Sequence, residues 1–580
     1  MATKVLTEPQ SVELQPVKAN GSSPDAASVE AEALSDPSSG SSPAPPSADA
    51  KTAIVHSKWR ATLVVAQLLG LNLFSSFCNG VVVVGLPAMA ASLHIDEGLL
   101  VWPTSVFYLT AGSCLLLAGS IADVVGTKTM SLVGAFAAAV SAMACGLAQS
   151  GGQLIAFRAL QGITNAIIVP SSVSIVSTGL EEGRPRNLGF ACLGFAGPIG
   201  FSLGLVLGGV FADSTGWRAA FYLAAATTFA LFLAGIWVLP KNAVRPGNKS
   251  LWSRTLTEID IVGAIIGTAS LVMLSYALAV LSADIHSIHK ASTIALLAVS
   301  AVLIPGFIAW MQYQKKRQRN ALIPNSLWKN WVFTSCCLMV LFTTAVCNCM
   351  ELYSSLFFQQ VQRHSALRAS LQILPSLISG ALTNISTGIF VNRMPVMWSV
   401  LISSTISAVA PLLMALIHPE WPYCCDILFT VGLLVVSDVF PAHMQALSGA
   451  VFNTCAQLGT AIGLTVTSLI ATSITKSSSN ADKESPSALL DGYRAVFWTM
   501  FAAMALTCVL SQLYNNFKVS RIGEYLARHE KGLNGMHSYR IWRVRQADAT
   551  DLASVTKSLV LTLPGISSCD VVRNLAQKPN

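Results

Sequence analysis

Residues 188–211 read LGFACLGFAGPIGFSLGLVLGGVF. The stretch has no charged side chain, and as an α-helix it is long enough to cross roughly 30 Å of hydrocarbon. Gly200, Gly204 and Gly208 repeat every four residues and therefore share one side of that helix. A helix face without side chains lets a neighbouring helix approach closely and slide. The stretch therefore predicts a membrane-spanning helix that packs tightly against a partner.

The rest of the chain has the composition of a membrane protein. Its 580 residues are 53% hydrophobic and only 11% charged, whereas soluble domains carry about 25% charged residues. Further apolar runs flank the quoted one, each long enough to span a bilayer. We expect an all-α protein with fourteen membrane helices, at Leu63–Leu86, Leu99–Ile121, Met130–Ala148, Leu154–Val176, Leu188–Phe211, Ala219–Leu239, Ile259–Leu281, Ala291–Met311, Val332–Phe357, Ser370–Val391, Val396–Ile417, Tyr423–Phe440, Leu447–Ile474 and Val496–Leu513.

Polar segments divide the chain into five regions. Residues 1–57 are rich in Ser, Pro, Ala and acidic side chains and predict a disordered tail. Residues 58–240 hold the first six helices, 241–330 a polar linker and two extra helices, 331–513 the last six, and 514–580 a basic tail. Because the chain opens on polar residues, we expect no signal peptide, and the first membrane helix serves as the insertion signal.

Basic residues predict that both tails lie in the cytoplasm. In that orientation Lys315, Lys316, Arg317 and Arg319 face inside, and the first, second and sixth outer loops carry no Lys or Arg. The net charge of +8 is then explained by topology, so we expect no nucleic-acid partner. The basic segment 518–545, interleaved with aromatic residues, either lies on the anionic inner leaflet or is an ordinary solvated tail.

Several kinds of chemistry have no signature in the sequence. The thirteen cysteines lack the spacing of a zinc site or a disulfide framework. No phosphate-binding loop of the Gly-x-x-x-x-Gly-Lys type occurs. His286 and His289 lie in a predicted outer loop, where exposed histidines without carboxylate partners usually bind no metal. We therefore expect no metal, no cofactor and no enzymatic activity, and we expect an ion gradient rather than ATP to drive any transport.

Two further segments carry polar groups at the edge of, or inside, an apolar run. Residues 119–128 read GSIADVVGTK, in which Gly119 permits close helix approach, Asp123 offers a carboxylate at the cytoplasmic edge and Gly126 permits a tight turn. Residues 158–162 read RALQG. An arginine within a membrane segment is costly unless it faces protein or water, and Gln161 shares its helix face.

In this order, the three segments resemble the loop after helix two, the helix-four arginine motif and the helix-five antiporter motif of the major facilitator superfamily. The two extra helices resemble its fourteen-spanner drug:proton antiporter branch, and Phe452–Leu464 is similar to fungal members. The resemblance extends over about residues 60–513 and implies two six-helix halves with two inserted central helices. It also implies that the glycines and proline of the fifth helix move during transport: Gly197, Pro198, Gly200, Gly204, Gly208 and Gly209.

The chain departs from the family pattern at two positions. Aligning the Gly-Gly of the antiporter motif with Gly208 and Gly209 puts Leu205 where the motif has proline. Cys78 aligns with an Asp that members of the branch often carry in the first helix. A standard first-helix proton site is therefore not expected here.

Proton coupling needs a titratable group in the transport pathway, and one acidic residue fits. Glu351 is the only acidic side chain well inside a predicted helix. In the resembled fold, helices one, four, nine and twelve line the cavity, which puts Arg158 and Glu351 at similar depth along one cavity. We expect Glu351, Arg158 and Asp123 to serve proton coupling and gating. The plain alternative is that Glu351 only hydrogen-bonds a neighbouring helix.

The remaining polar residues of the expected cavity are uncharged amides. A cavity of this kind, with Phe and Met nearby, suits amphiphilic or aromatic organic molecules. For each amide the alternative role is a hydrogen bond between helices. The candidate substrate residues are Asn72, Asn79, Gln161, Asn165 and Asn348.

These features together predict a secondary active transporter. We expect proton-coupled efflux of amphiphilic small organic molecules, by a monomer in the plasma membrane whose partners are the substrate, protons and the lipid bilayer. The alternatives are an importer or carrier of a small inorganic solute on the same fold, and a membrane sensor that transports nothing.

Overall fold

The computed structural model describes residues 57–240, 260–283, 285–317, 331–375, 396–416, 442–478 and 485–530. In these ranges the regular secondary structure is helical and no β-strand occurs. Ten of the described helices are long and apolar enough to cross a membrane. The expectation of an all-α membrane protein is thus confirmed. The expected number of fourteen spans is compatible with these helices, although the predicted run Tyr423–Phe440 lies outside the described residues.

The first six helices follow the predicted order. They are α1 (Lys58–Leu93), α2 (Trp102–Val125), α3 (Thr127–Leu147), α4 (Gly151–Gly179), α5 (Arg184–Asp213) and α6 (Arg218–Val238). Gly126 alone separates α2 from α3 and has φ 106°, a conformation that side chains with a Cβ rarely adopt. The tight turn expected at Gly126 is confirmed. A short 3₁₀ turn, η1 (Glu97–Leu99), precedes α2.

The two inserted helices form a hairpin held by one carboxylate. They are α8 (Ile261–Ala283) and α9 (Ala291–Lys316), joined by the 3₁₀ turn η2 (Ile285–His289). Oδ1 of Asp260 accepts from the backbone N–H of Gly263 at 2.9 Å and from the indole Nε1 of Trp310 at 2.9 Å. The same oxygen thus caps α8 and attaches α9 to it.

The second half is described in part. It comprises α10 (Trp331–Leu356), the π-helical turn η3 (Phe357–Val361), a helix that begins at Ala366 and is described to residue 375, α12 (Val396–Ala415), α14 (Ala442–Ser477) and α15 (Pro486–Glu530). The last helix is longer than the predicted run Val496–Leu513 at both ends, because the hydrophobic run marks only the part suited to the bilayer.

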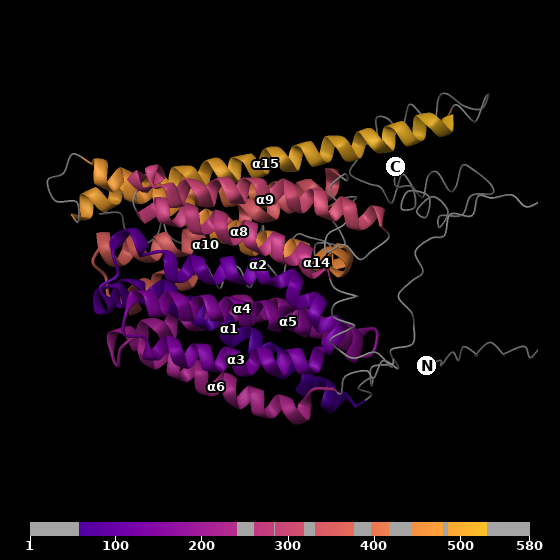
Figure 1. The fold of residues 1–580 in the computed structure, drawn as a ribbon, viewed down its shortest axis with the longest axis horizontal. Coiled ribbons are helices and arrows are strands. Elements are labelled where there is room, and N and C mark those ends of the chain that lie inside the picture. Colours follow the sequence, from indigo (N-terminus) through magenta and orange to yellow (C-terminus); the bar gives the residue numbers. More distant parts are fainter. Residues whose placement is uncertain are drawn as a thin grey trace, which may run out of the picture. The chain divides into compact units, whose positions relative to one another are not determined.

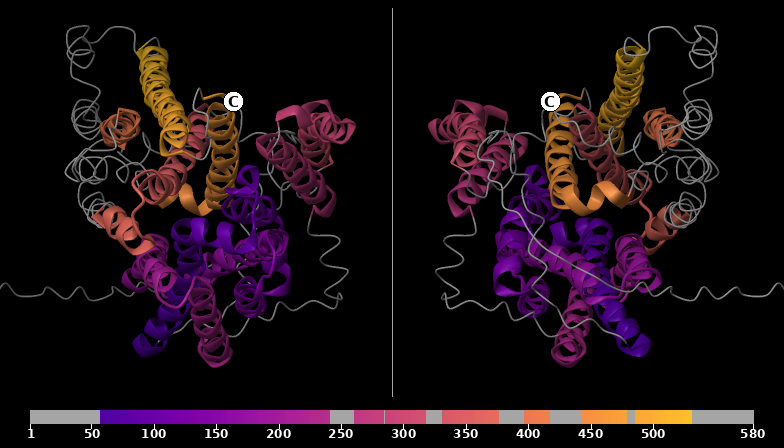
Figure 2. Two further views of the ribbon diagram at one scale, coloured as in Figure 1. Left: turned by 90° about the vertical axis from the view of Figure 1, so that its left-hand side faces the viewer. Right: turned by 90° about the vertical axis from the view of Figure 1, so that its right-hand side faces the viewer.

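The helices pack as two groups that contact each other. Within the first group α1 packs on α5, α2 on α4 and α3 on α6, and within the second α10 packs on α14 and α12 on α15. Between the groups, α2 packs on α14 and α1 on α10. The indigo-to-magenta helices α1–α6 and the orange and yellow helices lie on opposite sides (Figures 1 and 2), and α8 contacts both α2 and α14. The two halves therefore pack directly against each other, and the insertion contacts both of them through α8.

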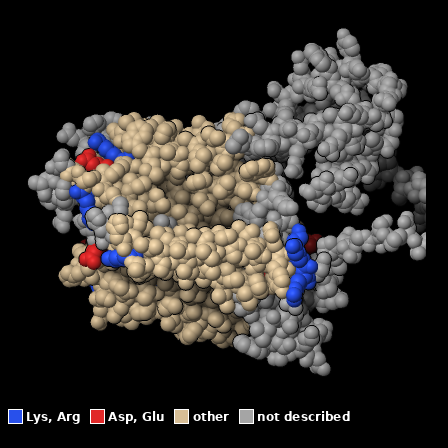
Figure 3. Space-filling model, turned by 45° about the horizontal axis from the view of Figure 1, so that its top comes forward, with Lys and Arg blue, Asp and Glu red and all other residues tan. Residues whose placement is uncertain are grey.

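The surface of the described helices suits a lipid environment. Large apolar side chains are exposed along them, including Trp237 at 75%, Val302 at 69% and Leu188 at 63%. On the face in Figure 3 the described charged residues lie at the two ends, with a band free of charge between them. Apolar side chains outside and polar ones between the helices are the arrangement that a bilayer favours.

Candidate functional site

Arg158 is the centre of a buried polar cluster in the first half. Its side chain is fully enclosed, at 0% exposure. Nε donates to the carbonyl of Pro103 at 3.0 Å, one terminal nitrogen to Oε1 of Gln161 at 2.7 Å and the other to Oδ1 of Asn79 at 2.5 Å. The guanidinium also lies 4.6 Å from the ring centroid of Phe107. Arg158 therefore ties α4 to α1 and α2 through neutral partners.

The sequence predicted part of this cluster. Gln161 was expected to share the helix face of Arg158, and the hydrogen bond between them confirms that geometry. Cys78 lies within electrostatic range of Arg158, so the α1 neighbour at this position is a thiol where the resembled branch often has a carboxylate. Asn79, the next residue, supplies an amide oxygen instead. Pro103 and Phe107 of α2 carried no sequence signal.

Glu351 lies on a polar face of α10, the helix in the second half that packs on α1. Thr344, Asn348, Glu351 and Ser355 follow one another at three- or four-residue steps and therefore share one side of the helix. The Glu351 side chain is half-buried and forms no hydrogen bond or ion pair with any residue that the structure describes. It does not contact Arg158 directly. The two residues that the sequence predicted to share one cavity are therefore not paired with each other in this conformation.

Tyr108 of α2 links the two charged sites. Its hydroxyl donates to Oδ1 of Asn348 at 2.8 Å, across the two halves, and its ring packs edge-on against Phe107 at 5.2 Å. Tyr108 lies within electrostatic range of both Glu351 and Arg158. Adjacent residues of α2 thus face the Arg158 cluster and the polar side of α10. No sequence motif indicated this role, because Tyr108 belongs to none of the recognisable segments.

The five candidate substrate amides are already engaged within the protein. Asn79 and Gln161 accept from Arg158, and Nδ2 of Asn348 donates to the Thr344 carbonyl at 3.0 Å and to Thr460 at 3.2 Å. Asn72 donates to Ser172 at 3.0 Å, and Asn165 accepts from Ser75 at 2.9 Å. All of these bonds connect helices or turns of the bundle. Of the five, Asn72 and Asn348 are half-buried and the other three are buried.

The glycines of α5 fall into two sets that face different neighbours. A Cβ built on Gly200 or Gly204 would collide with the backbone carbonyls of Leu73 and Phe77 in α1. A Cβ on Gly209 would lie 2.6 Å from the hydroxyl of Ser370, in the second half. Gly194 and Gly197 have no such close neighbour, and Pro198 lies inside the helix. The predicted close packing of α5 is therefore confirmed for Gly200 and Gly204, whose partner is α1.

The segment 119–128 has one described cross-helix contact. Nζ of Lys128 donates to the carbonyls of Ile236 at 2.8 Å and Leu239 at 2.9 Å, at the end of α6. Asp123 lies in the last turn of α2, and its side chain is outside what the structure describes. A Cβ on Gly119 would make an ordinary 3.7 Å contact with Pro170. The gating role of Asp123 remains a prediction.

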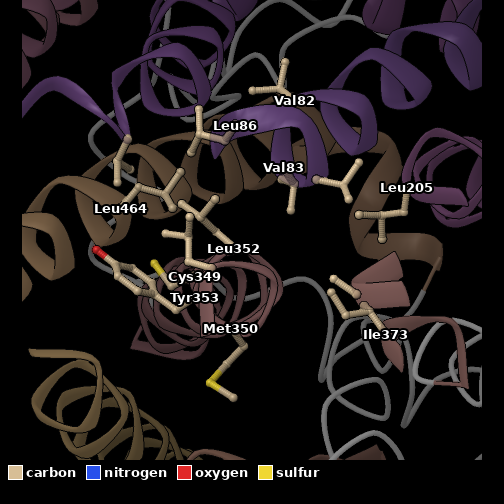
Figure 4. Close-up of a cluster of buried hydrophobic side chains, with 14 of the residues drawn as sticks. Val82, Val83, Leu86, Leu205, Cys349, Met350, Leu352, Tyr353, Ile373 and Leu464 are labelled. Carbon is tan, nitrogen blue, oxygen red and sulfur yellow. The ribbon is translucent and has the colours of Figure 1, made fainter. Parts of the chain in front are cut away.

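Buried apolar side chains from both halves pack together around α10. Figure 4 shows Leu86 of α1 and Leu464 of α14 beside Leu352 of α10, within one buried cluster that also contains Leu205 of α5. Among the described residues, no group of three or more His, Cys, Asp or Glu side chains is placed to hold a metal ion. The described contact between the halves around α10 is therefore largely apolar.

Comparisons with known proteins agree with this architecture. Residues 68–433 match the sequence profile of the Major Facilitator Superfamily. The chain is 35% identical to "MFS-type transporter 1" of Pyricularia oryzae over 83% of this chain and 88% of that protein. It is 25% identical to "Low affinity ammonium transporter" of Saccharomyces cerevisiae (67% and 78% covered) and 23% identical to "Efflux pump terJ" of Aspergillus terreus (75% and 84%).

The fold is similar to that of a solved transporter. A bacterial homologue of the human lysosomal transporter Spinster, solved in an inward-facing and occupied conformation, superposes with a TM-score of 0.55. The similarity covers 79% of this chain and 98% of that one, at 12% sequence identity. At this identity the similarity concerns the fold alone.

Proposed function

This chain belongs to the Major Facilitator Superfamily, and from that premise we propose that it is a proton-coupled exporter of amphiphilic small organic molecules. The membership makes it a multi-pass membrane transporter. The direction, the coupling ion, the substrate class, the monomeric state and the plasma membrane location are parts of the proposal.

One observation carries the proposal: the contrast between the two charges in the middle of the bundle. Arg158 is enclosed and bonded on three sides, whereas Glu351 is half-buried, lies within electrostatic range of Tyr108 of the first half and has no hydrogen-bond or ion-pair partner among the described residues. A charged side chain at membrane depth is costly and marks a functional site by default. Arg158 therefore suits a fixed structural role, and Glu351 suits a role that changes during transport.

A carboxyl group in this position can couple two fluxes. When the halves alternate their accessibility, Glu351 binds a proton on one side of the membrane and releases it on the other. Asn348 lies one turn before Glu351 on α10 and accepts from Tyr108 of α2, so the state of the carboxyl group can alter how the halves meet. Asp123, at the end of α2, is proposed as a gate on the cytoplasmic side.

Export is favoured by the glycines of α5 and by one relative whose name is that of an efflux pump. Import of a small solute is the second candidate, because another relative is named as an ammonium transporter.

The test compares cells that lack the chain with cells complemented by it. We expect deletion cells to retain amphiphilic dyes and their own amphiphilic products, and wild-type complementation to restore release. Complementation with Glu351→Gln is expected to restore little release. If deletion cells instead fail to take up an external nutrient and retain nothing, the chain is an importer. If neither flux changes, the sensor interpretation holds.

A further inference from the structure

Helix α1 carries a proline at a place where its backbone meets the second half. Pro87 lies inside α1, six residues before Leu93 ends the helix. A proline has no backbone N–H, so the carbonyl four residues earlier loses its helical donor. That carbonyl belongs to Val83, which is buried among the side chains that join the halves. A buried carbonyl without a donor is costly unless another group binds it.

The missing donor comes from the other half of the protein. The hydroxyl of Ser355, on α10, donates to the Val83 carbonyl at 3.2 Å. Nε2 of Gln359, in the π-helical turn η3, donates to the Val84 carbonyl at 3.0 Å and to the Ser355 hydroxyl at 2.9 Å. Ser355 is fully buried, so water does not compete for this carbonyl.

A second set of bonds joins the halves at the same end of the helices. The Ser370 hydroxyl donates to the carbonyl of Leu205 in α5 at 2.8 Å. The carboxylate of Asp213, the last residue of α5, accepts from the backbone N–H groups of Ala366 at 3.3 Å and Leu367 at 3.0 Å. Asp213 thus caps a helix of the opposite half. The predicted orientation puts this end on the outer side of the membrane.

Ser355 also lies near Glu351, the proposed coupling residue. It lies four residues beyond Glu351 on the same side of α10, toward the outer end. Any movement that opens the outer side to Glu351 must separate α10 from α1 at this point. The bond to Val83 therefore opposes that movement.

We infer that Ser355 is a positioning residue of the transport cycle, whose hydroxyl holds the outer side closed by binding the backbone carbonyl that Pro87 frees. A role in the transport cycle rests on the proposed function, but the bond itself can be tested without any substrate. The residue acts through α1 and is not proposed to contact substrate.

The chain contains a matched control for Ser355. Ser354 is the adjacent residue, is also buried, and its hydroxyl has no hydrogen-bond partner among the described residues. Ser354→Ala and Ser355→Ala remove the same atom from the same turn of α10. Only Ser355→Ala removes a bond between the halves. Ser355→Thr keeps a hydroxyl and serves as the conservative variant.

The experiment measures amide hydrogen exchange of the purified full chain in lipid nanodiscs. In Ser355→Ala we expect exchange at residues 88–93 and 357–366 to rise about fivefold, the change that loss of one ordinary buried hydrogen bond produces. Ser354→Ala should leave exchange there unchanged, and Ser355→Thr should restore most of the protection. Equal exchange in Ser354→Ala and Ser355→Ala would overturn the inference, as would a Ser355→Thr variant as exposed as Ser355→Ala.

The role of Pro87 is tested by a double-mutant cycle. Pro87→Ala returns an N–H to α1, so the Val83 carbonyl regains its own helical donor. Ser355→Ala should then increase exchange much less in the Pro87→Ala background than in the wild type. An undiminished effect would show that the carbonyl freed by Pro87 is not what Ser355 holds. Hydrogen exchange needs neither substrate nor a proton gradient. The result can therefore be interpreted even if the proposed export function is wrong.

Discussion

At the scale of single residues, the side chain of Arg158 organises the first half. Its three nitrogens bond three acceptors on three helices at once, and these acceptors are spread around a planar fork that the single nitrogen of an ammonium group cannot span. The sequence sufficed to identify Arg158 and Gln161, because both lie inside one apolar run three residues apart. It identified Asn79 as a candidate cavity residue but not as a partner of Arg158, and it did not identify Pro103 or Tyr108, because these contacts depend on how distant helices are packed.

Arg158→Lys is therefore expected to destabilise the protein despite keeping the charge. Two of the three hydrogen bonds are lost, and at about 1.5 kcal/mol for each charge-assisted bond the loss is about 3 kcal/mol. The measurement is the midpoint of thermal unfolding of the purified protein. Arg368→Lys is the control, since Arg368 is exposed and its side chain has no described partner. Equal midpoints for the two variants would contradict the organising role of Arg158.

At the scale of the helix, residues 188–211 predicted how one side of α5 packs but not how the other side packs. The repeat of Gly200, Gly204 and Gly208 indicated a flat face, and α1 packs against it. The spacing alone did not indicate that Gly209 faces the second half, because that requires the position of the helix beginning at Ala366. Helix lengths were also only partly predictable. The 36 residues of α1 exceed the apolar run that signals it, since polar ends can extend a helix beyond the bilayer.

Two alanine substitutions on α5 should have opposite effects. Gly204→Ala places a Cβ against the backbone of Phe77, which cannot move without separating α1 from α5, so we expect a loss of about 2 kcal/mol. Gly194→Ala meets no atom within 4 Å, so the higher helix propensity of alanine should leave stability unchanged or raise it by up to about 1 kcal/mol. Unfolding midpoints of both variants test this. Similar changes in the two midpoints would mean that helix propensity, rather than close packing, determines the effect of alanine at Gly204 on stability.

At the scale of the whole molecule, the two halves meet where α1 packs on α10, where α2 packs on α14, and where α5 bonds the helix that begins at Ala366. Glu351 lies on α10, one of these helices. The order of the motifs predicted two halves with an insertion, because each motif belongs to a definite helix of the resembled fold. The surroundings of Glu351 were not predictable in this way. The sequence indicates which side of α10 carries Glu351, whereas Tyr108 comes within electrostatic range of it from the other half. The described residues thus connect α2, through Phe107 and Tyr108, to both charged sites.

The measurement that tests the central claim most directly is proton flux in vesicles reconstituted with the purified chain. The vesicles contain a pH-sensitive dye, and an amphiphile exported in the cell assay is added as substrate. We predict that substrate movement drives proton movement in the wild type and not in Glu351→Gln, which should still fold and bind substrate. Glu182→Gln is the matched control, because the Glu182 side chain is 88% exposed. Wild-type coupling in Glu351→Gln would contradict the account and show that the proton is carried elsewhere, with Asp123 and Asp426 as the next candidates.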